Sequence, residues 1–139
     1  HMLVKEKDTL AAVQSVGKID AVYQAAAAAD VREILSEDML VTRLEVGKLS
    51  NTLMDYKYNS GFFYEKEICD LSDIIPVCDS RCQTLSYYGI EPQQLADFQR
   101  TCRPRGIGRS VPIGKTMDFN LVWDGCDLIC TMSRKISIL

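Results

Sequence analysis

The residues from Arg103 to Lys115 are those best suited by type to bind an anion. The sequence RPRGIGRSVPIGK holds four basic residues, three glycines and no acid, in a chain of formal net charge -3. Glycines let backbone N–H groups approach a phosphate, and Arg109 and Lys115 can supply charge-assisted hydrogen bonds. The pattern is not a Walker A loop, and its GxG lacks the third glycine of a dinucleotide-binding turn. A phosphate contact and a tight turn with solvated arginines are both open, and the turn is favoured.

A second group, around Trp123 and Asp124, sets an aromatic ring beside carboxylates. Gly125 and Asp127 follow at once. Such a group could orient a cationic partner or a substrate hydroxyl. Asp-Gly is also a common turn pair and tryptophan a common core anchor, so a structural role is the favoured interpretation.

Cysteines are the remaining candidates for chemistry. Cys78/Cys82 and Cys126/Cys130 share a CxxxC spacing that could place two thiolates on one helical face, as a zinc site requires. Buried thiols that fill the core are the simpler interpretation, and no metal is predicted. A chain of 139 residues needs no disulfides, so reduced thiols and a cytoplasmic location are expected.

Histidine chemistry is excluded because His1 is the only histidine. Residues 1–2 resemble the remnant of a cleaved tag, which leaves no Ser-His or Cys-His couple. A hydrophobic content of 47% with 25% charged residues predicts a folded globular protein. The acidic balance predicts no nucleic-acid partner, and the absence of a long apolar run predicts no membrane span.

The first part of the chain, residues 3–60, is predicted to be helical. Apolar residues recur at spacings near three and four from Leu10, with Gly17 as an interruption and Asp20 as the cap of a second helix to about Leu35. Ser36 would cap a further segment. From Leu40 to Val46 the alternation suits a strand equally well.

Residues 61–139 are predicted to form an α/β segment. The pattern indicates a strand at 62–69, a helix from Ser72 to about Arg81, a strand at 84–90, a helix from Pro92 and a short strand at 110–113. This β-α-β-α-β alternation is typical of layered α/β sheets. A short extended piece at 121–123, a turn and a last helix or strand would follow. The predicted fold class is therefore α/β, with N-terminal helices before a layered sheet.

The middle and end of the chain resemble the C-terminal part of the acyl-CoA reductase family. The resemblance runs from about Glu65 to Arg134 and rests on short motifs in the right order: Gln83-Thr84-Leu85, Tyr88-Gly89, Gly106-Ile107-Gly108-Arg109, Val111-Pro112-Ile113-Gly114-Lys115, Met117-Asp118-Phe119 and Trp123-Asp124-Gly125 with Asp127-Leu128. This is the NADPH-dependent fatty-acid reductase of bacterial bioluminescence systems and its non-luminous relatives, within the aldehyde dehydrogenase superfamily.

The resemblance implies a function in fatty acid metabolism. The whole enzyme would attack an acyl-CoA or acyl-protein thioester through a cysteine and reduce the acyl-enzyme to an aldehyde with NADPH. The catalytic cysteine and the NADPH-binding domain are expected outside this chain, so no catalytic residue is assigned here. Arg109, Lys115, Trp123 and Asp124 are the candidate substrate contacts. Surface that the missing domain would cover also predicts self-association into a homo-oligomer.

Two other hypotheses stay open at this stage. The chain could be a stand-alone α/β module that binds a nucleotide or phosphorylated ligand through the loop from Arg103 to Lys115. It could instead be an interaction domain held by zinc on the two CxxxC pairs. Ligand binding would support the first hypothesis, and zinc in the purified protein would support the second.

Overall fold

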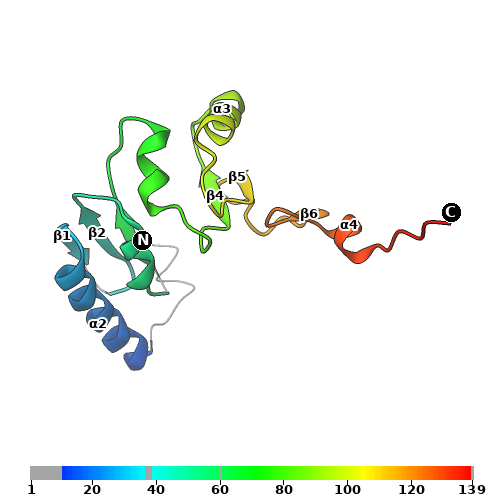
Figure 1. Ribbon diagram of the computed structural model, residues 1–139. Helices are drawn as coiled ribbons and strands as arrows, with labels where there is room; N and C mark the ends of the chain where they lie inside the picture. The colour runs from blue at the N-terminus through cyan, green and yellow to red at the C-terminus, as the bar shows by residue number, and fades with distance from the viewer. Residues whose placement is uncertain (1–10, 37–38, 60, 139) are drawn as a thin grey trace. The chain divides into compact units, whose positions relative to one another are not determined.

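The computed structural model describes residues 11–36, 39–59 and 61–138 of the chain. The chain divides into two compact units, His1–Val77 and Cys78–Leu139. Helices and small sheets occur in both (Figure 1), so the α/β class is confirmed at this level. Within the described ranges, no helix is long and apolar enough to cross a membrane.

The N-terminal unit is built on a three-stranded sheet. Its elements in chain order are α2 (Ala12–Ala28), β1 (Val31–Ser36), β2 (Thr42–Val46), the 3-10 helix η1 (Asn51–Asp55), β3 (Phe62–Glu65) and the 3-10 helix η2 (Leu71–Val77). The strand order is β1-β2-β3, with β1 antiparallel and β3 parallel to β2. Buried and exposed residues alternate along β2, and Arg43 on its exposed face holds the Glu65 carboxylate at 2.5 and 2.7 Å. The strand interpretation is therefore confirmed for Thr42–Val46, and residues 40 and 41 precede the strand.

Helix α2 continues through Gly17, so the predicted interruption there is wrong. A Cβ at this position would collide with the Tyr58 ring, and the glycine therefore makes room for a packed side chain. One turn of the helix also buries a charge. Lys18 is fully buried, and its Nζ donates hydrogen bonds to the carbonyls of Met39 and Leu40 at 2.5 and 3.0 Å. These bonds hold the chain just before β2, where Met39 has a positive φ of 63°.

The predicted helix from Asp20 to Leu35 is wrong beyond Ala28. Residues 31–36 form β1 instead, and Ser36 ends a strand rather than capping a helix. The residues Glu33 and Leu35 favour helix weakly, but pairing with β2 outweighs that preference. The segment 3–60 therefore contains strands as well as a helix.

The C-terminal unit contains a β-α-β element followed by a hairpin. Its elements are β4 (Thr84–Tyr87), α3 (Pro92–Cys102), β5 (Arg109–Pro112), β6 (Val122–Trp123), β7 (Cys126–Asp127) and α4 (Leu128–Met132). Strands β4 and β5 are parallel, and β6 and β7 are antiparallel. Helix α3 starts with proline, buries Leu95 and Phe98, and is tied to β5 by a hydrogen bond from Gln99 to Ser110 of 3.1 Å. These elements match the predicted strand, helix, strand and terminal helix.

The five predicted elements do not form one sheet in the described residues. Strand β3 pairs with β2, whereas β4 pairs only with β5. The helix expected from Ser72 to Arg81 is the 3-10 helix η2, which ends at Val77 and contains Pro76. The compact units divide after Val77, so β3 and η2 belong to the N-terminal unit and not with the segment predicted to start at residue 61.

Candidate functional site

Arg109, at the start of β5, contacts several segments of the C-terminal unit with one side chain. Its Nε donates a hydrogen bond to Thr84 Oγ1 on β4 at 3.2 Å. Its Nη1 and Nη2 donate to the backbone carbonyls of Asp118, at 3.4 Å, and of Thr116. Only 13% of the side chain is exposed. Because an arginine fork matches several acceptors at once, this side chain fastens the segment after β5 to the β4–β5 pair.

The same guanidinium also meets the hairpin. Its Cζ lies 4.0 Å from the centre of the Trp123 ring, a cation–π contact, and its Nε lies 4.0 Å from Oδ1 of Asp124. Phe119 stacks on Trp123 with ring centres 5.6 Å apart and an angle of 24° between the planes. The Arg109 guanidinium and the rings of Phe119 and Trp123 therefore join β5, the segment after it and the hairpin of β6 and β7.

Two glycines of the basic loop serve internal packing. Gly106 has a φ of 87°, and a Cβ there would collide with the Asp79 carbonyl oxygen. A Cβ on Gly108 would collide with the backbone of Asp124 and Gly125. Close backbone approach therefore explains the glycines of the GxG, whereas Arg109 after them is not the solvated arginine that the turn interpretation expected, since only 13% of its side chain is exposed.

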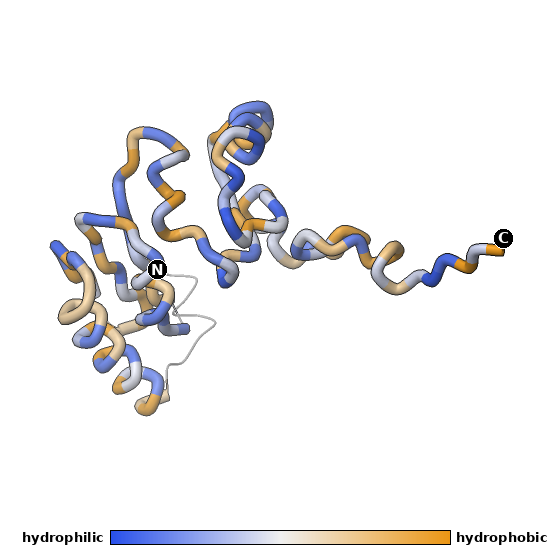
Figure 2. Tube along the Cα trace, in the orientation of Figure 1, coloured by the Kyte–Doolittle hydropathy of each residue, from blue (hydrophilic) through white to orange (hydrophobic). Residues whose placement is uncertain are grey.

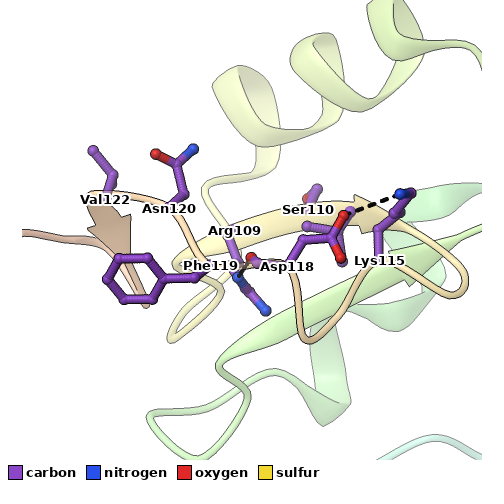
Figure 3. A pocket seen from close by; sticks show the side chains of 8 residues that line it. Arg109, Ser110, Lys115, Asp118, Phe119, Asn120 and Val122 are labelled. Atoms are coloured by element: carbon purple, nitrogen blue, oxygen red, sulfur yellow. Dashed lines mark hydrogen bonds and ion pairs between the residues drawn. The ribbon is translucent and has the colours of Figure 1, made fainter.

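Beside Arg109 lies a pocket of about 340 Å³ (Figure 3). Its lining comes from β5, the turn after it and the segment that leads to β6: Arg109, Ser110, Val111, Lys115, Asp118, Phe119, Asn120 and Val122. The turn is set by a hydrogen bond from the Lys115 N–H to the Pro112 carbonyl at 3.0 Å, and the next turn by one from Asp118 N–H to the Lys115 carbonyl at 3.2 Å. The lining side chains include two cations and one carboxylate.

Lys115 and Asp118 form an ion pair at the mouth of this pocket. Their Nζ and Oδ2 atoms are 3.1 Å apart, and the two side chains are 64% and 62% exposed. An exposed pair of this kind contributes little to stability, because water screens it and both side chains lose freedom. Lys115 can therefore exchange Asp118 for another anion.

The structure brings the four predicted site residues into one neighbourhood with different roles. Arg109 points inward and contacts Trp123 and Asp124, whereas Lys115 faces solvent on the pocket. Trp123 and Asp124 start the hairpin turn, with Asp124 at a φ of 49°, and neither lines the pocket. Of the predicted substrate contacts, Arg109, Trp123 and Asp124 therefore contact one another, and Lys115 is the one whose side chain faces solvent at the pocket.

Two lining residues, Phe119 and Asn120, were not among the predicted contacts. Phe119 is 72% exposed although it is a large apolar side chain. Asn120 makes no hydrogen bond with any residue in the described part of the chain. The run from Met117 to Asn120 has no strand or helix periodicity and therefore indicates a loop, but nothing in it marks these two residues as the lining of a pocket.

The six cysteines all lie in the described part of the chain and carry reduced thiols. Burial raises the pKa of the Cys78 thiol above its usual value, which disfavours the nucleophilic thiolate. Within residues 11–36, 39–59 and 61–138, no three or more His, Cys, Asp or Glu side chains are placed to hold a metal ion. Asp127 caps the N-terminus of α4, because its carboxylate accepts a hydrogen bond from the backbone N–H of Cys130 at 2.9 Å. This hydrogen bond lowers the pKa of Asp127.

Comparison with protein-family models, with curated proteins and with solved structures finds no match for this chain.

Proposed function

We propose that this chain is the C-terminal part of the catalytic domain of an NADPH-dependent acyl-CoA reductase. The whole enzyme would cleave a fatty acyl thioester through a cysteine and release the aldehyde. The catalytic cysteine and the NADPH-binding domain lie outside this chain in the proposal. The proposal starts from the order of short motifs between Gln83 and Asp127.

The observation that carries it is the convergence of those motifs on Arg109. Thr84 of the first motif accepts from Nε of Arg109. The backbone carbonyls of Thr116, which follows the fourth motif, and of Asp118 in the fifth accept from Nη2 and Nη1. Trp123 of the last motif lies under the guanidinium. Motifs spread over some forty residues therefore build one interlocked unit, as expected if the resemblance extends to a shared fold rather than to chance short matches.

Secondary structure supports the same class. Strand β4, helix α3 and strand β5 form the parallel β-α-β element from which aldehyde dehydrogenase-like layered sheets are built. A parallel pair is ordinarily buried inside a larger sheet. In the proposal, strands of the remaining catalytic domain extend this pair and complete the layered arrangement.

Exposed apolar side chains are a further support. Helix α2 exposes Val13, Val16 and Tyr23, and the segment after β5 exposes Ile113 and Met117. In Figure 2 apolar positions recur along the trace from β5 to the C-terminal end. In the proposal, the rest of the enzyme or a second copy covers such surface.

In the complete reaction, a cysteine thiolate would attack the thioester carbonyl and form an acyl-enzyme, and the CoA thiol would leave. NADPH would supply a hydride to the acyl carbonyl carbon, and cleavage of the carbon–sulfur bond would release the aldehyde and restore the cysteine thiolate. The Gly106 to Gly108 loop does not fit the diphosphate of that cofactor, because both glycines are used in packing against other backbone. This chain's own contribution would be sheet, subunit contact and one wall of the thioester channel.

The test uses the complete reading frame that contains this chain. The whole protein should oxidise NADPH when acyl-CoA is added, and mass spectrometry should find an acyl thioester on a cysteine outside these 139 residues. This chain alone should show no turnover. Robust NADPH oxidation by the chain alone, or no reductase activity of the whole protein, would overturn the proposal.

One observation favours a second candidate function, a stand-alone binding module for a nucleotide or phosphorylated ligand. The pocket beside Arg109 has a cation, Lys115, that faces solvent, and hydrogen-bonding side chains around it. The reductase assay distinguishes the two candidate functions. A binding module would produce no aldehyde, whether this chain or the complete protein is assayed.

A further inference from the structure

The pocket beside Arg109 has chemically different ends. Figure 3 shows the Phe119 ring at one end and the Lys115 ammonium at the other, with Arg109 between them. Asn120 lies on the Phe119 side and Ser110 on the Lys115 side. A ligand that fits must therefore be aromatic at one end and anionic at the other.

The aromatic end is a stacking surface that is open on one side. Phe119 is held by its stack on Trp123, and Arg109 in turn supports Trp123 at 4.0 Å. The ring is nevertheless 72% exposed, so a planar group can lie against it. A base on an aromatic side chain is a common and strong element of nucleotide recognition.

Asn120 adds a hydrogen-bonding group for the base. Its side-chain amide is a donor and an acceptor side by side, and it makes no hydrogen bond to the described residues of the chain. Such an amide can pair with a base edge that presents a donor beside an acceptor, as the amino group and ring nitrogen of adenine do. The aromatic end therefore accommodates an adenine base, and the choice of adenine follows from the proposed function.

In the described part of the chain, the anionic end has one cation that a ligand can reach. Arg109 is bonded to carbonyls of its own chain and lies 4.0 Å from the Asp124 carboxylate, so its charge is already matched. Among the described residues, Lys115 pairs with the exposed Asp118 carboxylate, at 3.1 Å, and can turn to a phosphate. Ser110 offers a hydroxyl on the same side.

We propose that this pocket binds an adenine nucleotide that carries a phosphate on its ribose, with the base on Phe119 and Asn120 and a phosphate on Lys115. The proposal rests on the proposed function, because that reaction uses two such molecules, the CoA thioester and NADPH. They share the adenine and differ in the position of the ribose phosphate, which is 3′ in CoA and 2′ in NADPH. The CoA end is the expected ligand, since NADPH is assigned to the missing domain.

The experiment is a titration of the 139-residue chain, labelled with ¹⁵N, with adenosine 3′,5′-bisphosphate and separately with the 2′,5′ isomer. The 3′,5′ compound should shift the amide signals of residues 115–120 with a dissociation constant on the order of 0.1–1 mM, as expected for a shallow pocket. Tighter binding of the 2′,5′ isomer would assign the pocket to NADPH and overturn the CoA assignment. Absence of shifts at saturating concentrations of both would overturn the proposal.

Matched variants locate the ligand. Phe119→Ala should weaken binding about tenfold through the lost stack, and Lys115→Gln by a similar factor, whereas Lys135→Gln and Phe63→Ala should leave it unchanged. Asp118→Asn should tighten binding, because it removes the carboxylate that competes for Lys115. Asn120→Ala should weaken binding of adenosine 3′,5′-bisphosphate, because it removes the amide that pairs with the base edge. If Phe119→Ala binds as well as the unchanged chain, or inorganic phosphate binds as tightly as the nucleotide, a nucleotide pocket is ruled out.

The two proposals fail separately. Binding is measured on this chain without turnover, so a bound nucleotide with an inactive whole protein would remove the reductase function and keep the pocket. An active whole enzyme whose KM for acyl-CoA is unchanged by Lys115→Gln and Phe119→Ala would remove the pocket and keep the function.

Discussion

Replacing Arg109 by methionine should strongly destabilise the C-terminal unit. The change keeps the length of the side chain but removes hydrogen bonds to Thr84, Thr116 and Asp118 and the contact with Trp123. Hydrogen bonds from a charged group contribute about 1.5 kcal/mol or more each, and a cation–π contact about 0.5–1 kcal/mol. Removing the guanidinium from water costs free energy, which offsets part of these contributions. We therefore expect the free energy of unfolding to fall by about 2–3 kcal/mol, a large part of the stability of a unit this small.

Trp123 makes the measurement direct, because it is the only tryptophan of the chain. Its fluorescence in urea follows the unit that contains Arg109. With a slope of about 1 kcal/mol per molar urea, the midpoint should fall by about 2 M. The matched control is Arg105→Met in the same loop, where the side chain is exposed and the midpoint should hardly move. If both variants shift the midpoint equally, Arg109 is not the centre of the unit.

Three further predictions concern stability. Lys18→Met should destabilise the N-terminal unit by about 2 kcal/mol relative to Lys48→Met, measured by circular dichroism in urea, because two carbonyls lose a buried donor. Gly106→Ala should destabilise the C-terminal unit by about 1 kcal/mol or more beyond Gly114→Ala, since both have a φ of 87° but only Gly106 faces the Asp79 carbonyl; equal losses would contradict this packing. Arg81 lowers the pKa of Asp79 from 3.8 to about 2, so its stabilisation should be present above pH 3.8 and lost as the pH falls through about 2. Asp79→Asn should abolish that part of the pH dependence of the urea midpoint.

Local patterns predicted the C-terminal unit well because its elements are short and strongly marked. Pro92 marks the start of α3, and the apolar spacing of Leu95 and Phe98 identifies its buried face. Gly89, with a φ of 69°, follows β4 as expected. In the N-terminal unit the pattern failed where partners decide the conformation. Residues 31–36 become a strand only through pairing with β2, and Gly17 is explained only by Tyr58.

Residue types selected four residues that the structure brings close together, but they did not indicate the different roles of these side chains. An arginine that binds a phosphate and one that binds carbonyls of its own chain look alike in a sequence. What separates them is the position of Thr116 and Asp118, whose carbonyls are brought to Arg109 by the turns after β5. The same turns place Phe119 and Asn120 in the lining of the pocket. The sequence did not predict these two lining residues because it does not show where the turns bring them.

This division of roles gives a sharper test than either variant alone. If Arg109 supports the pocket and Lys115 binds the ligand, Arg109→Met should shift the urea midpoint and abolish nucleotide binding together, because the stack of Phe119 on Trp123 is lost. Lys115→Gln should weaken binding and leave the midpoint unchanged, since its exposed ion pair contributes little. If Lys115→Gln instead lowers the urea midpoint and leaves nucleotide binding unchanged, Lys115 stabilises the unit and does not bind the phosphate.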